Sequence, residues 1–407
     1  MTRTLETLVI GGGYAGVVAA NRLSTSPHLS VTLINPRPVF VERIRLHQRA
    51  TGTYGATVPY REVLAPAVHL AVGTATRIDT ASRLIETATG SPLRYDHLVY
   101  AVGSNGARPE VPGAATHALL PSTLEQADAL RTALDAAAPD APVCVVGAGS
   151  TGVEMAAELA EQGRAVTLLA GGGLAPALHP STRRDVARRF EQLGATVLSG
   201  DGARVVAVHP DRVDLADGRT LPAALTVWTA GFGVPDLARR SGLSTDPLGR
   251  LLTDETLTSI DDDRIVAAGD CAAPSGVPYR MCCAAAQPLG AQAADTVLRR
   301  VAGTAPRPRS IATPGQCLSL GRDTGVLQLA RRDDTSLRAH LSGRSGARVK
   351  EAITAGTLTG LRTMSRRPGL IPAMHLLQDP RRADVLAARG PGSSARPSAE
   401  TGSVLAD

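Results

Sequence analysis

The chain has 407 residues, enough for two or three domains that each bury a core, and its hydrophobic fraction of 43% is ordinary for a folded protein. Its formal net charge of +6 is spread along the chain without a recognisable nucleic-acid module, so we exclude nucleic acid as a partner and expect anionic ligands. The sequence has no run of 18 apolar residues and no CxxC pair among its five cysteines, so we expect no transmembrane segment and no metal site.

The first predicted element is a buried strand at residues 8–10, followed by the turn GGGYAG at residues 11–16 and a helix at residues 17–23. A G-x-G-x-x-G turn between a strand and a helix is typical of dinucleotide binding. Its first glycine permits the tight turn, its second lets the backbone approach a pyrophosphate, and its third lets the helix pack on the strand. The helix N-terminus offers unpaired N–H groups to the phosphates. The residues expected to contact the cofactor here are Gly11, Gly13, Tyr14, Ala15 and Gly16.

A second strand, at residues 31–34, ends where a dinucleotide site usually carries a ribose-binding acid. The residue at this position is Asn35, whose amide can hydrogen-bond a ribose hydroxyl but adds no charge assistance. We therefore expect a cofactor site that is weakened at the ribose and otherwise intact.

The same pattern occurs again in the middle of the chain. A strand at residues 143–146 leads into GAGSTG at residues 147–152, a helix to about Gln162 and a strand at residues 165–169. Two complete fingerprints, each between a strand and a helix, indicate two dinucleotide sites much more specifically than one fingerprint would. The expected phosphate-binding glycines of the second site are Gly147, Gly149 and Gly152.

The ribose-binding acid is missing from the second site too, where Ala170 or Gly171 takes its place. Because such a carboxylate repels the 2′-phosphate of NADP, its absence leaves both NADPH and NADH open, with NADPH slightly favoured. Arg183 and Arg184 follow as candidate phosphate partners, or simply as the solvated face of a helix at residues 181–193.

Three later segments complete the pattern. Residues 95–104 and 225–231 each read as a strand followed by a small-residue turn, and residues 264–272 read as a strand that ends at Asp270. Together with the fingerprints, they make residues 5–305 resemble the pyridine-nucleotide-dependent FAD oxidoreductases with two dinucleotide-binding domains. Within that family the chain is most similar to the branch of type II NADH:quinone oxidoreductases and apoptosis-inducing-factor-like proteins.

The resemblance implies an α/β fold with two Rossmann-like dinucleotide-binding domains, the nicotinamide domain inserted in the FAD domain, plus a small C-terminal α+β domain. The implied parts are an FAD-binding domain (1–112 and 240–309), an NAD(P)-binding domain (113–239), a C-terminal domain (310–378) and a disordered tail (379–407). Within the C-terminal domain, the sequence predicts strands at residues 317–321 and 325–330 and a helix at residues 348–362.

The resemblance also implies a flavin site, in which Asp270 binds the ribityl chain. Other residues implied to contact the flavin cofactor are Arg43, Gly103, Gly269, Pro288 and Leu289. For the last two, the sequence predicts a helix that starts at Pro288 or just after it, because proline interrupts a helix, so that the helix N-terminus faces the flavin.

The segment at residues 39–48 should pass beside the flavin ring, by resemblance. It contains no cysteine, so the thiol relay of the disulfide reductases is absent. Arg45 would stabilise the reduced flavin and His47 would relay a proton, whereas a solvated surface helix is the alternative for both residues. Glu154 matches an acid implicated in protonating the acceptor in the quinone reductases, and its alternative is a helix surface position.

The expected activity is hydride transfer from NAD(P)H through the flavin to a two-electron acceptor, a quinone or another metabolite. The family's paired glutamines of the quinone site are matched poorly by Gln287 and Gln292, which leaves the acceptor open. Two alternatives are a flavin-dependent oxidase or dehydrogenase of a small metabolite with a vestigial nicotinamide site, and a redox sensor with poor turnover. We expect a cytoplasmic protein, with attachment to a membrane surface and a homodimer both open.

Overall fold

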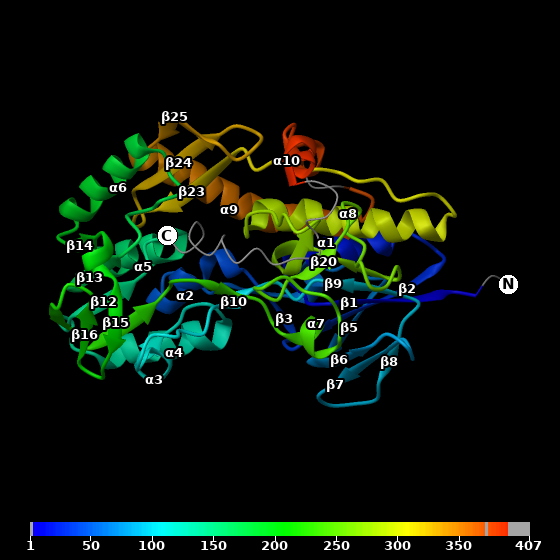
Figure 1. Cartoon of the computed structure of the whole chain (residues 1–407), viewed down its shortest axis with the longest axis horizontal. Helices are drawn as coiled ribbons and strands as arrows, with labels where there is room; N and C mark the ends of the chain where they lie inside the picture. The colour runs from blue at the N-terminus through cyan, green and yellow to red at the C-terminus, as the bar shows by residue number, and fades with distance from the viewer. Residues whose placement is uncertain (1–2, 371–372, 390–407) are drawn as a thin grey trace.

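One half of the molecule is built around a sheet of five parallel strands in the order β21-β9-β1-β2-β5. The computed structural model, which describes residues 3–370 and 373–389, shows this half beside a second, similar half and a smaller third part (Figure 1). The strands of the first sheet are β1 (Leu5–Ile10), β2 (Leu29–Asn35), β5 (Val68–Val72), β9 (His97–Tyr100) and β21 (Ile265–Ala267). Residues 8–10 of β1 and 98–100 of β9 are continuously buried and almost entirely apolar, because both faces of the sheet are covered there.

A second sheet of five parallel strands has the order β11-β18-β12-β13-β14. Its strands are β11 (Ala118–Leu119), β12 (Val143–Val146), β13 (Val166–Ala170), β14 (Thr196–Ser199) and β18 (Leu225–Trp228). Each fingerprint lies in a strand–helix–strand unit, with α1 (Tyr14–Leu23) in the first half and α5 (Ser150–Glu161) in the second. Since β21 joins the first sheet only after the whole second sheet, the predicted insertion and α/β fold are confirmed. The residue boundaries between domains stay a prediction.

Smaller sheets and helices flank the two parallel sheets. Two antiparallel sheets consist of β6 (Ala75–Asp79), β7 (Leu84–Thr87) and β8 (Leu93–Arg94), and of β15 (Val205–Val208), β16 (Arg212–Leu215) and β17 (Thr220–Pro222). Three short pairs are β3 (Val39–Val41) with β4 (Thr57–Pro59), β10 (Asn105–Gly106) with β19 (Phe232–Gly233), and β20 (Leu251–Thr253) with β22 (Ala272–Pro274). The flanking helices are α2 (Leu46–Thr51), α3 (Ala114–His117), α4 (Leu124–Ala136), α6 (Pro180–Gln192) and α7 (Leu237–Arg240).

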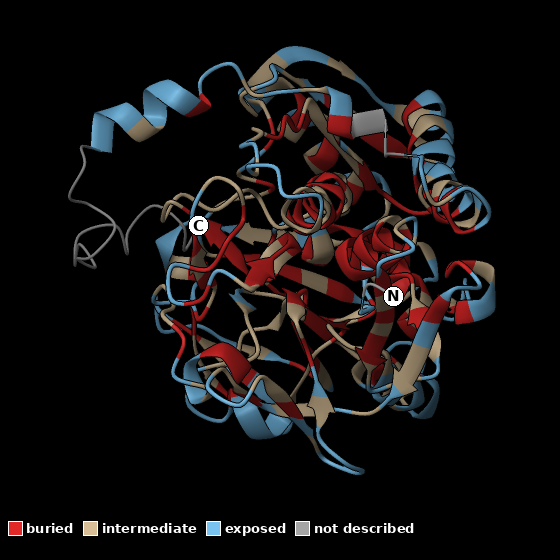
Figure 2. Cartoon of the chain, turned by 90° about the vertical axis from the view of Figure 1, so that its right-hand side faces the viewer, coloured by how far each residue is buried: buried red, intermediate tan, exposed pale blue. Residues whose placement is uncertain are grey.

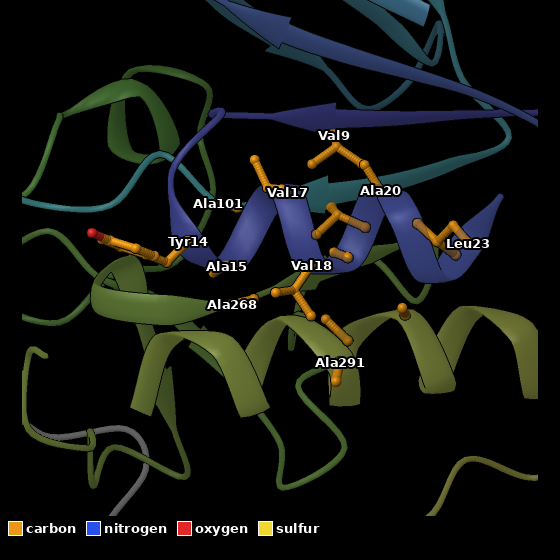
Figure 3. Close-up of a cluster of buried hydrophobic side chains, with 14 of the residues drawn as sticks. Val9, Tyr14, Ala15, Val17, Val18, Ala20, Leu23, Ala101, Ala268 and Ala291 are labelled. Carbon is orange, nitrogen blue, oxygen red and sulfur yellow. The ribbon is translucent and has the colours of Figure 1, made fainter. Parts of the chain in front are cut away.

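Two helices far apart in the sequence pack against each other beneath the first sheet. Figure 3 shows α1 between β1 and α8 (Cys283–Val301), with Val18 and Ala291 in the contact. The helices approach closely at Gly290, where a Cβ atom would collide with the backbone carbonyl of Ala15. This contact fixes the start of α1, and with it the first fingerprint, against the later part of the chain.

The third part is an antiparallel sheet followed by a long helix, as predicted for an α+β unit. Its strands are β23 (Gly315–Ser319), β24 (Gly325–Ala330) and β25 (Ser336–Leu341), and its helix is α9 (Gly343–Arg366). The sequence predicted the first two strands and the middle of the helix, whereas β25 and the outer turns of α9 were not predicted. In Figure 1, α9 runs from this sheet towards α1, so it borders both halves of the molecule.

The predicted start of a helix at Pro288 is wrong. Helix α8 begins at Cys283, and Pro288 lies in its second turn. At this position proline removes a single backbone hydrogen bond, the one to the carbonyl of Ala284. The packing of the helix against α1 outweighs that loss, since eleven residues of α8 are buried. The helix N-terminus therefore lies at Cys282 and Cys283 rather than at Pro288.

The predicted disordered tail falls mostly on residues 390–407, which lie outside the described residues. Residues 382–389, however, form a helix, α10 (Arg382–Arg389), which is largely exposed beyond its buried start (Figure 2). Arg382 is buried there and pairs with Glu255 at 2.8 Å, and its guanidinium lies 4.5 Å from the ring centroid of Tyr279. Composition alone did not show this docking contact. Within residues 3–370 and 373–389, no helix is both long enough and apolar enough to cross a membrane.

Candidate active site

One continuous cleft of about 3640 Å³ runs between the two halves and reaches α9. Typical ligand pockets measure roughly 300–1,000 Å³, so the cleft has room for more than one large ligand. It is bordered by both glycine fingerprints, by the turns after β9, β18 and β21, and by the segment that follows β3. The predicted site residues that line it are Gly11, Gly13, Tyr14, Ala15, Asn35, Arg43, His47, Gly103, Gly147, Gly149, Glu154, Gly269 and Asp270.

The two fingerprints have the same local geometry. Gly11 and Gly147 have φ angles of +103° and +100°, which side chains rarely adopt, and both start the turn from strand to helix. The third glycine of each turn, Gly16 or Gly152, does not line the cleft. It packs against the first glycine of the turn instead, so closely that a Cβ atom there would strike the carbonyl of that glycine. The third glycine thus has the packing role that the motif predicts.

The middle glycines leave the space that a pyrophosphate needs. A Cβ atom on Gly13 or Gly149 would meet no other atom within 4 Å and would project into the open cleft. Each of these glycines is also the N-cap of its helix, and neither has a side chain that caps the first turn. The N–H groups at the start of α1 and α5 are therefore free to bind phosphate oxygens. Both cradles fit a dinucleotide.

Further features of the first cradle fit FAD. Tyr14, at the start of α1 (Figure 3), lines the cleft and packs edge-on against Phe40, and its buried hydroxyl has no hydrogen-bond partner among the described residues. At the ends of β9 and β21, the Ser104 hydroxyl donates to an Asp270 carboxylate oxygen at 2.6 Å, and the guanidinium of Arg43 lies 3.6 Å from the same carboxylate. Burial lowers the pKa of Arg43, and Asp270 offsets part of this effect. A carboxylate held in this way can accept a hydrogen bond from a hydroxyl of the ribityl chain.

Asn35 lies at the edge of the first cradle, where the sequence predicted it. Its side-chain oxygen accepts from the Gly12 N–H at 3.0 Å, and its amide donates to the Arg37 carbonyl at 2.8 Å. These bonds fix the glycine-rich turn to the end of β2. Asn35 thus shapes the turn, and its exposed edge is the part left for a ribose hydroxyl.

Arg45 does not line the cleft, contrary to the role predicted beside the flavin. Its guanidinium pairs with Glu351 of α9 at 2.5 Å and lies 3.7 Å from Glu42, and it lies over the ring of Tyr54 at 4.3 Å. The arginine that meets the cleft in this segment is Arg43, two residues earlier. Arg45 instead connects the first half of the molecule to α9.

Pro288 and Leu289 do not line the cleft either. Leu289 is 2% exposed and belongs to the apolar core between α1 and α8, and the carbonyl of Pro288 is 3.3 Å from a ring nitrogen of His375. Cleft-lining residues of this helix occur in its first turns, at Cys283, Ala284, Ala286 and Gln287. The prediction for this pair depended on the helix starting at Pro288, so it fails for the same reason.

The surroundings of the second cradle leave the nucleotide preference open. Arg183 and Arg184 border a separate hollow on the outer side of α6 and do not reach the cleft. A different arginine, Arg204, lines the cleft beside Gly171 and forms no side-chain ion pair within the described part of the chain. Asp201 lines the same rim. No local pattern in the sequence pointed to Arg204, because the residue reaches the rim only through the turn after β14.

Glu154 is buried, so the surface alternative for this residue is wrong. One carboxylate oxygen lies 3.2 Å from the ammonium of Lys350, and it accepts from the backbone N–H of Ser319 at 2.9 Å. The other oxygen lies 3.7 Å from Nδ1 of His47, whose Nε2 is 3.4 Å from the Ser319 hydroxyl. We call these four residues the buried polar cluster. It takes one residue each from α2, α5, β23 and α9, at the wall where the cleft meets all three parts.

The charges in the buried polar cluster follow from burial and pairing. Burial alone would raise the pKa of Glu154. Lys350, His47 and the Ser319 N–H lower this pKa by more than burial raises it, so the net shift is downward and the carboxylate is ionised. Burial lowers the pKa of His47 to about 4, so its ring is neutral near neutral pH. The resemblance to the family had already pointed to Glu154 and His47 as site residues. Lys350 and Ser319 were missed because they lie more than 160 residues from Glu154 in the sequence.

The comparisons with known proteins agree with this site. The sequence pattern of the family described as pyridine nucleotide-disulphide oxidoreductase matches residues 5–294. An NADH dehydrogenase-like protein of Mycobacterium tuberculosis is 34% identical over 300 residues, covering 67% of this chain and 73% of the relative. The demethylphylloquinone reductase of Synechocystis is 28% identical over 353 residues, covering 78% of this chain and 85% of the relative.

A solved structure shares the fold of this chain. The structure of NDH2 from Plasmodium falciparum in complex with NADH superposes with a TM-score of 0.75 at 16% identity, covering 90% of this chain and 99% of the other. The family match, the two cradles and the shared cleft agree on cofactors and activity. The chain therefore belongs to the pyridine nucleotide-disulphide oxidoreductase family and is a flavoprotein NAD(P)H dehydrogenase that uses FAD and a nicotinamide nucleotide.

Proposed function

We propose that the electron acceptor is a quinone, which binds where the cleft meets α8 and α9. The observation that carries this proposal is the third wall of the cleft, which lies beyond both dinucleotide cradles. The residues of α9 on this wall are mainly small or apolar: Lys350, Ile353, Thr354, Gly356, Thr357, Thr359, Gly360, Thr363 and Met364. A flat apolar ring fits a wall of this kind, with a few polar groups to orient it.

The names of relatives support the same acceptor. They include the demethylphylloquinone reductase and a type II NADH:quinone oxidoreductase of Haemophilus influenzae, 25% identical over 326 residues. The mismatch of Gln287 and Gln292 with the family's glutamine pattern does not remove the site, because Gln287 lines the cleft while Gln292 points into the fold and donates to the Glu255 carbonyl at 2.8 Å.

The residues of this chain hold and orient the reactants. Bound FAD would supply the redox chemistry, taking a hydride equivalent from NAD(P)H and passing two electrons on. The turn at Gly13 and the start of α1 would hold its pyrophosphate, and Asp270 would hold its ribityl chain. The turn at Gly149 and the start of α5 would hold the nicotinamide nucleotide. Glu154, at the second turn of α5, would bring the buried polar cluster to the reacting end of the cleft.

The test is anaerobic stopped-flow mixing of the FAD-loaded protein with NADH or NADPH, followed by mixing with a soluble quinone such as menadione. We expect fast bleaching of the flavin by at least one nucleotide and fast quinone-dependent recovery of its colour. Fast bleaching without recovery would contradict the quinone proposal and point to another acceptor. Comparing the two nucleotides in the same experiment decides the preference that the absent acid at Ala170 and Gly171 leaves open.

A further inference from the structure

The second cradle has no acid at the position where the two nicotinamide nucleotides differ. In a cradle of this type the adenosine ribose lies at the end of the second strand, where a carboxylate usually accepts its 2′-hydroxyl. That strand is β13, which ends at Ala170 and is followed by Gly171. Neither residue has a polar side chain, so the group that faces this position decides whether a 2′-hydroxyl or a 2′-phosphate binds there.

Arg204 is the residue that faces Gly171. A Cβ atom added to Gly171 would lie 3.1 Å from the Cα atom and 3.2 Å from the Cβ atom of Arg204, and its three nearest atoms all belong to this arginine. A side chain at position 171 would therefore crowd the base of the arginine side chain. The glycine thus removes the usual acid and at the same time lets a cation approach the place of the ribose.

The backbone fixes Arg204 in this position. The residue connects the turn at residues 201–203 to β15, and its neighbours Ala203 and Val205 are buried. Its N–H donates to the Asp201 carbonyl at 3.1 Å, and its carbonyl accepts from the Ala216 N–H at 2.9 Å. Since the backbone is extended here and the residues on both sides point into the core, the side chain of Arg204 points outward, and it lines the cleft.

The guanidinium of Arg204 is available to a ligand. Among residues 3–370 and 373–389 it has no partner in an ion pair or a hydrogen bond. Two arginines in the antiparallel sheet that follows are engaged instead, because Arg212 pairs with Asp211 at 3.2 Å and Arg219 pairs with Asp217 at 2.7 Å. The free cation of this region is therefore the one that lines the cleft.

The turn beside Arg204 also has room for a phosphate. Gly171, Gly172 and Gly173 all line the cleft, and a Cβ atom on Gly173 would meet no other atom within 4 Å. Three consecutive residues without side chains leave the surface next to the guanidinium open.

We propose that Arg204 binds the 2′-phosphate of NADPH and makes NADPH the preferred hydride donor of this protein. A guanidinium and a phosphate can form two parallel, charge-assisted hydrogen bonds, whereas the 2′-hydroxyl of NADH offers no charge to pair. The inference concerns the nucleotide alone and does not depend on the identity of the electron acceptor.

One acidic residue on the same rim opposes this preference. Asp201 lines the cleft, and its carboxylate would repel a phosphate or accept a ribose hydroxyl. Arg204 outweighs Asp201 because the arginine is in direct contact with Gly171, whereas no atom of Asp201 is among the three nearest to a Cβ atom at that position.

The first test measures binding without turnover, by isothermal titration calorimetry of the FAD-loaded protein with NADP⁺ and with NAD⁺. We expect the native protein to bind NADP⁺ about 10-fold more tightly than NAD⁺. Arg204→Gln should raise the Kd of NADP⁺ by about 10-fold and change that of NAD⁺ by less than about twofold. The matched control is Arg183→Gln, which removes an arginine outside the cleft and should bind both nucleotides like the native protein.

A second titration isolates the adenosine end of the nucleotide. The fragment 2′,5′-ADP carries the 2′-phosphate and AMP lacks it, so the native protein should prefer 2′,5′-ADP, and Arg204→Gln should lose this preference. Asp201→Asn should bind 2′,5′-ADP at least as tightly as the native protein, because the substitution removes only a repulsive charge.

Three outcomes overturn the proposal. The first is a native protein that binds NAD⁺ as tightly as NADP⁺ or more tightly. The second is an equal loss of both nucleotides in Arg204→Gln, which would indicate a structural role. The third is weakened binding of 2′,5′-ADP in Asp201→Asn. No electron acceptor is present in these titrations, so a failure of the quinone proposal cannot be mistaken for a failure of this one.

Discussion

Replacing Arg45 by methionine should destabilise the protein while leaving its flavin reducible. Arg45 and Glu42 are only 3% and 2% exposed, so the substitution keeps the bulk of the side chain but leaves a buried carboxylate without its cation. Removing one partner of a buried pair costs about 3 kcal/mol or more. The second partner, Glu351, is 54% exposed and contributes little.

The size of the effect on thermal unfolding follows from the length of the chain. Unfolding entropy is about 2.1 cal/mol/K per residue, so 3 kcal/mol lowers the Tm of a 407-residue chain by about 3–4 °C. The matched control is Arg362→Met, whose pair with Glu62 is 41% and 36% exposed and should change Tm by less than about 1 °C.

The loss should also depend on pH. Burial raises the pKa of Glu42 in the native protein, although Arg45 opposes the rise. A carboxyl with a raised folded-state pKa favours the folded state most when it is protonated, so its contribution falls as pH rises through that pKa. Without Arg45 the pKa rises further. The Tm deficit of the variant should therefore grow as the pH rises above the ordinary pKa range of a carboxyl group.

Thermal unfolding followed by circular dichroism checks the stability, and stopped-flow bleaching by NAD(P)H checks the site. We expect bleaching within about twofold of the native rate, since Arg45 does not line the cleft. An unchanged Tm together with strongly slowed bleaching would refute this reasoning and restore the flavin-side role that the sequence suggested.

Three further changes test other parts of the structure. Gly13→Val should abolish FAD retention, whereas Gly149→Val should keep the yellow colour and weaken the nucleotide by roughly 100-fold, read from flavin absorbance and a bleaching titration. If both variants lose FAD, the assignment of the cradles is wrong. Arg382→Ala should cost about 2 kcal/mol and expose α10 to limited proteolysis; an unaltered digestion pattern would contradict that docking contact. Replacing Arg183 and Arg184 by alanine should leave the ratio of NADPH to NADH affinity unchanged, and a marked drop for NADPH would place them at the cleft after all.

The sequence was sufficient for features that depend on local pattern. The two fingerprints predicted two strand–helix–strand units because a glycine turn, a buried strand and a helix start are all local signals, and both units are present. The burial of Glu154 was not predicted, because it depends on Lys350 and Ser319 packing over α5 from the far end of the chain.

Other differences have a common physical cause. The helix start at Pro288 and the flavin-side role of Arg45 were both predicted from short segments, and in both places a contact with a distant helix decides the outcome. One signal for the missed part of the site was present in the composition. Lysine counted apart from arginine would have marked position 350 as unusual.

The insertion of one sheet within the other has a consequence for the order in which the chain folds during synthesis. Every strand of the second sheet lies between residues 118 and 228, so this sheet can close as soon as that stretch has left the ribosome. The first sheet must wait for β21, and α1 must wait for α8, which ends at residue 301. Until then the face of α1 that packs against α8 has no partner. The newborn chain thus carries a finished nicotinamide half beside an unfinished flavin half, and this interval is when a chaperone has most to protect.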